Sequence, residues 1–334
     1  MALNEKISIV IISKNEEANI ESCIESVINS FESLSNVNYE IILVDSNSED
    51  NTIVKALKYG EKYPLKIIEI THSNLFSAAL GRKVGSEQAV GEYILFLDGD
   101  MILENDFLSE GMEILENNSE DKVGLIGLRR DVISLPNGKI QIQDNIYKTH
   151  KVRTAEHFGG ALLIKASVLK EVGNYYSHLI SSEEPELYLR LKKNGYYILE
   201  APIKMITHKI IKPSKQSIYK RVFSKRTLGI GQTFRSAIDN NSFLQLLTHN
   251  ALNKFLVPFI LDIATLVFLI VCISLNYNLL ISLMGIFVIQ LLGISYSLIT
   301  KNIKSNLYIK IIFVNTIVGF FYKPKLNVEL KKIK

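Results

Sequence analysis

The 334-residue sequence predicts an α/β domain with a mostly parallel sheet, followed by C-terminal transmembrane helices. Short apolar runs alternate with helical patterns over the first hundred residues, which is typical of parallel strands joined by crossover helices. The last of these runs ends in the acidic pair Asp98 and Asp100. Two stretches of 21 residues near the carboxyl end carry a single ionisable group between them, which predicts helices that cross a membrane.

Charge is distributed very unevenly along the chain. Residues 1–200 contain 20 Lys and Arg against 31 Asp and Glu, whereas residues 201–334 contain 18 Lys and Arg against three acidic residues. This division predicts an acidic soluble head and a basic, apolar tail that faces a membrane. The basic residues flank long apolar runs instead of lining one polar face, so nucleic-acid binding is not expected. The two cysteines, Cys23 and Cys272, predict no disulfide framework.

The predicted parallel sheet follows from the strands and helices expected in the first hundred residues. Strands are expected at apolar, β-branched runs, and helices are expected where apolar residues recur at three- to four-residue spacing. The expected strands are 7–12, 39–44, 65–70 and 93–97, with helices beginning near residues 20, 51 and 75. The first strand is not followed by Gly-x-Gly-x-x-Gly, so a dinucleotide oxidoreductase is not expected.

The pattern changes past residue 104, where a helix to about residue 117 and a strand over 123–128 are expected. Pro136-Asn137-Gly138 predicts a hairpin over 133–142. Gly159 and Gly160 precede a further apolar run; paired glycines allow the backbone to approach a ligand closely, and a plain bend is equally compatible with them. Ser182 is expected to cap a helix whose first turn is acidic.

The acidic pair, Asp98 and Asp100, predicts the chemistry of the head. Ligands of open α/β sheets bind just beyond the carboxyl ends of the strands. Two neighbouring carboxylates repel each other unless a cation lies between them, and Mg²⁺ or Mn²⁺ takes oxygen ligands and commonly holds a substrate phosphate as well. Gly99 allows the tight turn that brings the backbone close to such a phosphate. The alternative is a solvated polar turn without a ligand.

Residues 255–275 and 279–299 are each long enough to cross the hydrocarbon core as a helix, and Asp262 is the ionisable group within them. Lys254 lies before the first stretch and Lys301 follows the second, so the positive-inside rule places both ends of this hairpin on the cytoplasmic side. Asp262 is expected to face the other helix or to lie where a lipid headgroup enters.

Three parts of the chain are therefore expected: a domain over 1–210, a basic juxtamembrane segment over 211–250, and a membrane region over 251–334. The basic segment is interpreted as amphipathic and lying at a lipid surface, with a solvated basic helix as the alternative. The apolar stretch 307–322 contains Lys310 and is interpreted as re-entrant or interfacial, with a third span as the alternative. The amino terminus has no signal-peptide pattern, so the head is expected in the cytoplasm, at the inner (plasma) membrane.

Five motifs in a fixed order resemble family 2 glycosyltransferases of the GT-A fold, over about residues 6–210. They comprise an opening strand and turn (8–17), a second turn (44–52), a helix and acidic strand (81–100), a glycine-pair segment (158–173) and an acidic helix start (183–196). The resemblance implies a Rossmann-like domain that transfers a sugar from a nucleotide sugar with inversion, the nucleotide being UDP in most relatives.

The resemblance also implies roles for single residues around the donor. Asp100 would bind Mn²⁺ or Mg²⁺, and Asp98 would bind the metal or the ribose. His208 lies where similar enzymes place a further metal ligand, with a structural role as the alternative. The remaining donor contacts implied are Asp45 with the base, Ser13 and Glu16 along the same pocket, and Arg82 with the base or the phosphates.

An inverting transfer needs a carboxylate that takes the proton from the attacking hydroxyl. The family usually has Glu-Asp at this point, whereas this chain has Glu183 and Glu184. The resemblance therefore implies Glu184 as the base, with Glu183 as the alternative.

The membrane region indicates a lipid-linked acceptor, such as a polyprenyl-linked sugar or oligosaccharide of cell-envelope assembly. Processive synthases of this family carry Gln/Arg-x-x-Arg-Trp before their membrane helices, and this chain contains no tryptophan. Transfer of one or a few sugars is therefore expected. The alternatives are a processive polysaccharide synthase of the same fold and a membrane protein that binds a nucleotide sugar without turnover.

Overall fold

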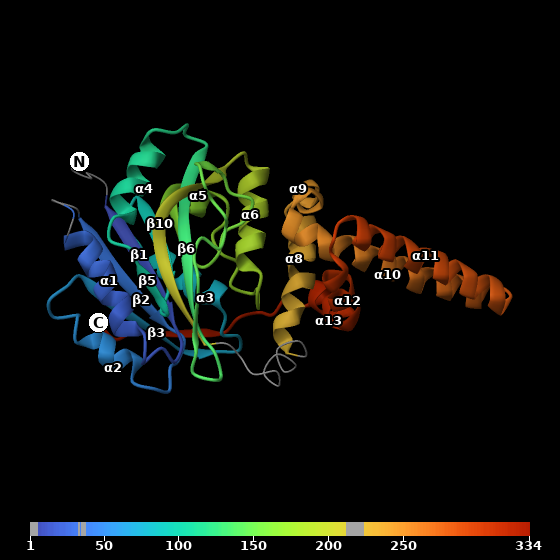
Figure 1. Cartoon of the computed structure of the whole chain (residues 1–334). Coiled ribbons are helices and arrows are strands. Elements are labelled where there is room, and N and C mark those ends of the chain that lie inside the picture. The colour runs from blue at the N-terminus through green and yellow to red at the C-terminus, as the bar shows by residue number, and fades with distance from the viewer. Residues whose placement is uncertain (1–5, 33, 35–37, 212–223) are drawn as a thin grey trace. The chain divides into compact units, whose positions relative to one another are not determined.

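The computed structural model describes residues 6–32, 34, 38–211 and 224–334. The chain forms two compact units (Figure 1). Residues 1–220 and 323–334 make up the first, which we call the sheet unit, and residues 221–322 make up the second, which we call the helical unit. Of the basic segment expected over 211–250, residues 212–223 lie outside the described residues.

One mixed sheet forms the centre of the sheet unit. Its strands are β1 (Ile7–Ser13), β2 (Tyr39–Asp45), β3 (Leu65–Ser73), β4 (Tyr93–Asp98), β5 (Met101–Leu103), β6 (Lys122–Ser134), β7 (Ile140–Gln143), β8 (Arg153–Thr154), β9 (Leu162–Lys165), β10 (Tyr197–Ile211) and β11 (Val328–Lys332). The strand order is β11-β3-β2-β1-β4-β9-β6-β10-β5, with β7 paired to β6 and β8 paired to β10.

The half of the sheet that contains β3, β2, β1 and β4 is parallel, as the alternating strand and helix pattern predicts. The other half is mixed, because β9 is antiparallel to β4 and to β6, while β10 is parallel to β6. The hairpin expected around Gly138 is present as the antiparallel pair β6 and β7. The α/β fold class predicted from the sequence is confirmed.

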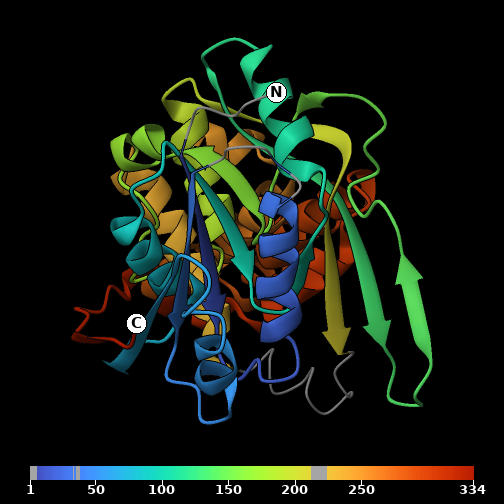
Figure 2. The same ribbon diagram turned by 90° about the vertical axis from the view of Figure 1, so that its left-hand side faces the viewer.

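The helices of the sheet unit are α1 (Ile20–Glu32), α2 (Thr52–Leu57), α3 (Ala78–Gln88), α4 (Phe107–Glu116), α5 (Ala166–Glu171) and α6 (Glu183–Lys193). Helices α1, α2 and α4 lie on one face of the sheet, and α3 and α6 lie on the other (Figures 1 and 2). Gly85 lets α3 approach β1 closely, since a Cβ there would lie 2.3 Å from Cγ1 of Val10. This close packing brings α3 against the strands that carry the acidic edge.

The carboxyl end of the chain belongs to the sheet. Strand β11 pairs antiparallel with β3, with Leu330 opposite Ile70. From the sequence, these residues were expected to form the basic tail of the membrane region. Strand β11 carries only two apolar residues, Val328 and Leu330, among glutamate and lysines. Such a short, largely charged strand is recognised only from its pairing with a neighbour.

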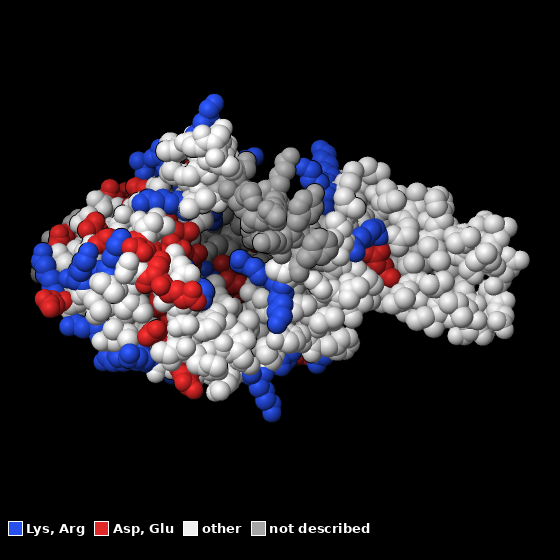
Figure 3. Space-filling view, turned by 90° about the horizontal axis from the view of Figure 1, so that it is seen from below, with Lys and Arg blue, Asp and Glu red and all other residues white. Residues whose placement is uncertain are grey.

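The helical unit contains the short helix η1 (Lys225–Thr227) and the helices α8 (Leu228–Asp239), α9 (Phe243–Thr248), α10 (Asn250–Ser274), α11 (Leu279–Ile299), α12 (Ile303–Ile311) and α13 (Phe313–Phe321). Leu252–Ser274 and Leu279–Ile299 are long and apolar enough to cross a membrane, as predicted. Helices α12 and α13 meet at a bend of 67°. The face of the α10–α11 hairpin seen in Figure 3 is almost entirely free of charged residues.

Asp262 on α10 faces the neighbouring helix, which was one of the two arrangements expected for it. The Gln290 amide of α11 donates to Oδ1 of Asp262 at 3.1 Å, and the Lys310 ammonium of α12 lies 2.6 Å from the same oxygen. The carboxylate that is costly inside lipid is therefore paired within the helical unit.

Candidate active site

The carboxyl ends of β1, β2 and β4 bring the predicted donor residues to one edge of the sheet. Ser13 is in register with Asp45, and Ile12 is in register with Asp98. The amide of Gly99 donates to the carbonyl of Ile12 at 2.9 Å, which fixes the turn between the two aspartates against β1. This is the edge at which open α/β sheets bind ligands.

Arg82 is the centre of the first cluster of predicted residues. Its guanidinium is buried and donates to Asp98 at 2.8 Å and to Glu183 at 2.7 Å, and it lies 3.4 Å from Glu184. Burial alone would lower the pKa of Arg82, but the carboxylates of Asp98, Glu184 and Glu183 raise it well above its ordinary value. Arg82 therefore stays charged and joins the end of β4 to the first turn of α6.

Gly160 makes room for this ion pair. A Cβ at residue 160 would lie 2.4 Å from Oδ2 of Asp98 and 2.7 Å from the guanidinium of Arg82. Gly159 has more space, because the nearest atom to its Cβ position is the hydroxyl of Tyr147 at 3.0 Å. Gly160 is therefore required by the side chains of Asp98 and Arg82, and approach of this backbone to a ligand stays a prediction.

Glu183 and Glu184 begin α6 and are both largely buried, with 9% and 19% of their side chains exposed. Burial and the neighbouring carboxylate of Glu183 raise the pKa of Glu184 to about 7, against the opposing charge of Arg82. Ser182 occupies the N-cap position with φ of 64°, and its side chain makes no cap hydrogen bond. The expectation that the Ser182 side chain caps this helix is therefore wrong: its backbone is left-handed, whereas a capping serine has an extended backbone.

Asp100 and His208 form the second cluster. Strand β10 pairs antiparallel with β5, which places His208 opposite Met101 and its Nε2 atom 3.1 Å from Oδ2 of Asp100. Oδ1 of Asp100 is buried without a hydrogen-bond partner. Carboxylate oxygen and imidazole nitrogen are both ligands of Mn²⁺, whereas Mg²⁺ prefers oxygen alone.

The donor types and the unpartnered oxygen of Asp100 thus fit a divalent cation of the Mn²⁺ kind. Among the residues that the structure describes, no three His, Cys, Asp or Glu side chains are close enough together to form a complete metal site. A cation would draw its remaining ligands from a bound substrate and water, as is usual for ions that hold phosphates.

Arg129 of β6 orients the His208 ring. Its guanidinium lies 2.7 Å from Nδ1 of His208 and donates to Asp131 at 2.7 Å. An arginine has donors only, so Nδ1 must accept this bond, and the proton of a neutral imidazole is left on Nε2, where it is directed at Asp100. For Nε2 to bind a cation, the ring proton would have to lie on Nδ1 instead, where the carboxylate of Asp131, 3.4 Å away, could accept it in place of the bond from Arg129.

Ser13, Asp45 and Glu16 organise the turns that follow β1 and β2. Asp45 is completely buried and accepts from the hydroxyl of Ser13 at 2.8 Å and from the amide and hydroxyl of Ser48 at 2.7 and 2.6 Å. The Asn15 side chain joins the two turns by accepting from the amide of Glu49 at 2.9 Å. The two turns form one connected rim beside the acidic pair.

Glu16 lies next to the acidic pair, because a Cβ at Gly99 would be 3.1 Å from its Cγ atom. Burial and the carboxylates of Asp100 and Asp98 raise the pKa of Glu16, although Asn19 donates to it. Glu16 thus adds negative charge beside Asp98 and Asp100, which favours a cation bound near this corner of the sheet.

Three residues of the site, Arg129, Asp131 and Tyr147, were not predicted from the sequence. Tyr147 is hydrogen-bonded to Arg129, and burial raises its pKa. The signal for the first two was the abrupt change from the apolar run of β6 to Arg129-Arg130-Asp131, since charged residues that extend a buried strand commonly serve a site. Tyr147 lies in a loop, and nothing in its local sequence distinguishes it.

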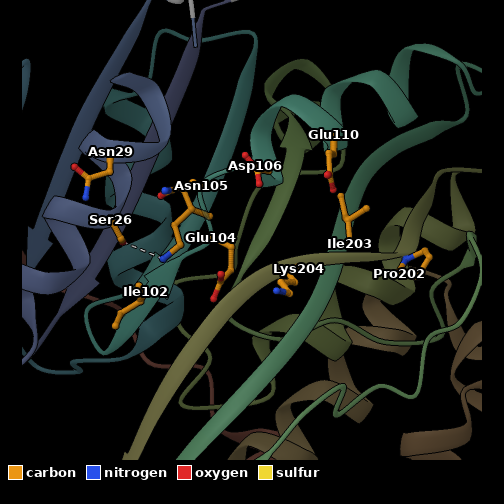
Figure 4. Close-up of a pocket in the computed structure, with 11 residues that line it drawn as sticks. Ser26, Asn29, Ile102, Glu104, Asn105, Asp106, Glu110, Pro202, Ile203 and Lys204 are labelled. Carbon is orange, nitrogen blue, oxygen red and sulfur yellow. Dashed lines mark hydrogen bonds between the residues drawn. The ribbon is translucent and has the colours of Figure 1, made fainter. Parts of the chain in front are cut away.

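A separate hollow of about 780 Å³ opens between α1, the β5–α4 loop and the middle of β10 (Figure 4). It is lined by polar residues that include Asn29, Asn105 and Lys204, and by Glu104, whose carboxylate accepts from Thr207 at 2.9 Å. None of the predicted site residues lines it. The candidate active site is therefore a different place on the sheet unit.

Residues 8–170 match the sequence profile of glycosyl transferase family 2. The chain is 27% identical over 201 residues to glycosyltransferase AglE of Haloferax volcanii, an alignment that covers 57% of this chain and 62% of that protein. It is 32% identical over 119 residues to a dolichol-phosphate mannosyltransferase of Pyrococcus furiosus, covering 36% of this chain and 32% of that protein. Both alignments span less than two thirds of the relative's own length.

Two solved structures share the fold at low sequence identity. The mannosyltransferase PcManGT of Pyrobaculum calidifontis, in complex with GDP-Man and Mn²⁺, superposes with a TM-score of 0.57 at 16% identity, covering 96% of this chain and 88% of that chain. TarS of S. aureus (residues 1–349), in complex with UDP-GlcNAc, superposes with a TM-score of 0.51 at 18% identity, covering 70% of this chain and 66% of that chain. The matched profile, the relatives and this shared GT-A fold agree with the ordered motifs: residues 8–170 form a domain of glycosyl transferase family 2.

Proposed function

We propose that the sheet unit transfers a sugar from a nucleotide sugar to an acceptor hydroxyl with inversion at the anomeric carbon, and that Glu184 is the general base. The observation that carries this proposal is the pKa of about 7 for Glu184, a largely buried carboxyl joined through Arg82 to the acidic edge of the sheet. A base works best when its pKa lies near the operating pH, because it is then deprotonated and still accepts a proton readily.

In this proposal Glu184 takes the proton from the acceptor hydroxyl while the oxygen of that hydroxyl attacks the anomeric carbon of the donor sugar. The bond between that carbon and the diphosphate breaks at the same time, which inverts the configuration. Glu183 is the less suitable base, because it is more buried and its carboxylate is held by Arg82 at 2.7 Å. Arg82 is assigned to positioning Glu184 against Asp98.

Asp100 and His208 are proposed to hold Mn²⁺ or Mg²⁺, and Asp98, which is paired with Arg82, is proposed to bind the ribose or, after a shift of its side chain, the same cation. The cation, when bound, neutralises the negative charge that develops on the departing nucleoside diphosphate. The unpartnered Oδ1 of Asp100 and the carboxylate-rich corner around Glu16 support this placement. Arg129 and Asp131 are assigned to orienting the His208 ring.

The rim formed by the turns after β1 and β2 is proposed to hold the nucleoside, which we expect to be uridine. Ser13 and Asp45 shape this rim, and Glu16 lies between it and the acidic pair. Because both carboxylate oxygens of Asp45 already accept hydrogen bonds, its contact with the base requires that Ser13 or Ser48 share one of them.

The acceptor is proposed to be lipid-linked, with a polyprenyl carrier as the expected class. The chain carries two helices long and apolar enough to cross a membrane, and these would hold the sheet unit at a cytoplasmic membrane surface. A relative named for dolichol-phosphate mannosyl transfer supports the same class of acceptor. Assembly of a cell-envelope glycan or glycolipid is the process in which we place this reaction.

The proposal is tested with the purified full-length protein in two steps. A thermal-shift screen of nucleotide sugars with Mn²⁺ or Mg²⁺ identifies the donor, because a ligand that binds the native state raises its unfolding temperature. Transfer of a radiolabelled sugar to a polyprenyl phosphate is then measured, and the anomeric configuration of the product is determined. One inverted sugar per lipid is expected; a retained configuration, or donor binding without release of nucleoside diphosphate, would refute the proposal, and a long polymer would favour a processive synthase.

A further inference from the structure

We propose that α12 and α13 form a re-entrant element that enters only the leaflet on the sheet unit's side of the membrane, so that the chain crosses the bilayer twice. Its surface partner is the acyl-chain region of that leaflet. The inference rests on the membrane placement of α10 and α11 proposed above. It assigns which of the candidate segments cross the bilayer.

Chain connectivity limits the number of crossings. The chain leaves the sheet unit after β10 and returns to the same sheet as β11, which pairs with β3. A chain that leaves and returns on one side of a bilayer must cross it an even number of times. The candidate spans are α10, α11 and the bent pair α12–α13, so an odd count of three is excluded.

The two helices that cross the bilayer are α10 and α11. They pack against each other and are joined by a turn of four residues, 275–278, so that if one crosses the membrane the other must return across it. Helix α8 has 12 residues and a length of about 18 Å, too short for a core of about 30 Å. The stretch 212–223 also has only 12 residues, four of them Lys or Arg.

Helix α12 runs back along α11 toward its middle. The Asn306 side chain donates to the carbonyl of Gly293 at 3.0 Å, and one turn further along α12 the Lys310 ammonium donates to Gln290 at 2.6 Å. Gln290 lies about 14 Å along the helix from Ile299, which is roughly half of the hydrocarbon thickness. Helix α12 therefore reaches about the midplane and ends there, at the 67° bend.

Helix α13 is held against α8, which precedes the first span and so stays on the sheet unit's side. A Cβ at Gly231 would lie 2.0 Å from the carbonyl oxygen of Thr316, and a Cβ at Gly319 would lie 2.1 Å from that of Leu228. These two glycines bring the helix backbones into direct contact, an arrangement that is common between helices in membranes. The packing brings the chain back to the side from which it entered.

The ion pair between Lys310 and Asp262 makes the entry of α12 tolerable. A lysine near the midplane is costly unless it is paired, and here its ammonium contacts both Asp262 and Gln290. Beyond Lys304, which is exposed near the start of α12, the outer face of α12 and α13 is apolar and between 47% and 72% exposed, and we assign it to contact with acyl chains. The residues of this face are Leu307, Ile311, Val314, Val318 and Phe321.

Cysteine labelling in the full-length protein tests the topology. Glu61→Cys, Tyr277→Cys and Lys325→Cys place exposed thiols on the sheet unit, on the α10–α11 turn and after α13. Sealed vesicles of both orientations are treated with a membrane-impermeant maleimide; the unmodified chain is the background control, because Cys23 and Cys272 are buried. Residues 61 and 325 are expected to be labelled from one side and residue 277 from the other.

Labelling of residues 61 and 325 from opposite sides would overturn the re-entrant element and leave the proposed reaction untouched. Labelling of residue 277 from the same side as residue 61 would overturn the two crossings and, with them, the proposed membrane placement. A nitroxide attached through Ile311→Cys separates re-entry from surface binding. It is expected to be more accessible to oxygen than to a water-soluble nickel complex, and the reverse order would overturn entry into the leaflet.

Discussion

Arg82 on α3 and Asp98 at the end of β4 form an ion pair of 2.8 Å in which the arginine side chain is 2% exposed. The same guanidinium holds Glu183 at 2.7 Å, so that the acidic turn after β4 and the first turn of α6 are joined by a single buried cation. The two halves of the proposed reaction, donor binding and proton removal, thus share one charged group.

Replacing Arg82 with Met leaves Asp98, Glu183 and Glu184 without their shared partner. Removing one member of a buried ion pair typically costs about 3–5 kcal/mol, so the free energy of unfolding of Arg82→Met should fall by that amount. Denaturant unfolding measures it. The matched control is Lys83→Met, because Lys83 forms only an exposed pair with Glu87; an equal loss in both variants would show that the cluster has no special stabilising role.

Gly160→Ala tests the close approach at the site. Its Cβ would overlap Oδ2 of Asp98 and the guanidinium of Arg82, whereas Gly159→Ala would meet only the movable hydroxyl of Tyr147. We expect kcat/KM to fall by about 100-fold or more in Gly160→Ala, as for loss of an electrostatic group, with far-ultraviolet circular dichroism unchanged. Equal kinetics in the two alanine variants would contradict the assignment of Asp98 and Arg82 to the reaction.

The pH dependence follows from the raised pKa of Glu184. The carboxyl must be ionised to act as a base, so kcat/KM should fall tenfold per pH unit below about pH 7. The same group affects folding: between pH 4.5 and 7 the native state binds more protons than the unfolded state, so stability falls as the pH rises through this window.

Two variants separate these effects of Glu184. Glu184→Gln should remove its contribution to the stability slope between pH 4.5 and 7, as measured by denaturant unfolding at several pH values. Glu184→Asp keeps a carboxylate and should retain most of the transfer activity. A stability slope that is the same in the Gln variant and the original chain would show that another group titrates in this range.

The metal assignment predicts graded effects on Mn²⁺ binding. Asp100→Ala should abolish saturable Mn²⁺ binding in the presence of nucleoside diphosphate, and His208→Ala should weaken it by about 10–100-fold, the range seen when a group that supports a metal is lost. Electron paramagnetic resonance of free Mn²⁺ reports both values. His150→Ala is the control, since His150 is exposed in a loop. An unchanged affinity of the Asp100→Ala variant for Mn²⁺ would refute the placement of the metal at this edge of the sheet.

Asp262 and Lys310 should be energetically coupled in the helical unit. Their atoms lie 2.6 Å apart, and residues in direct contact show coupling energies of about 0.5–3 kcal/mol. Lys310→Met and Asp262→Asn should each lower the unfolding temperature in bilayer discs, and the double variant should recover part of the loss. Strictly additive losses would mean that the pair does not hold α12 in place.

The parallel half of the sheet could be predicted because its strands are short apolar runs in sequence, each followed by its own helix. The same local rule located Asp98, Asp100 and Asp45, which all end such runs. The links of Arg82 to Glu183 and of Asp100 to His208 join residues more than a hundred positions apart. No local pattern specifies such contacts, so only the resemblance to a family placed these residues in one site.

The parts that could not be predicted depend on pairing between distant segments. Strand β5 has three residues and exists because β10 pairs with it, and that pairing sets His208 beside Asp100. Arg129 contacts this histidine only because β6 lies beside β10. Strand β11 is largely charged and forms on the exposed edge of β3.

The most direct test of the account is the single-turnover rate of sugar transfer by Glu184→Gln, with donor and Mn²⁺ saturating. The amide has nearly the shape of the carboxyl but cannot accept the proton, so the account predicts a rate lower by about 100-fold or more, with donor affinity unchanged. Transfer at the rate of the unmodified chain would show that Glu184 is not the base and would contradict the account.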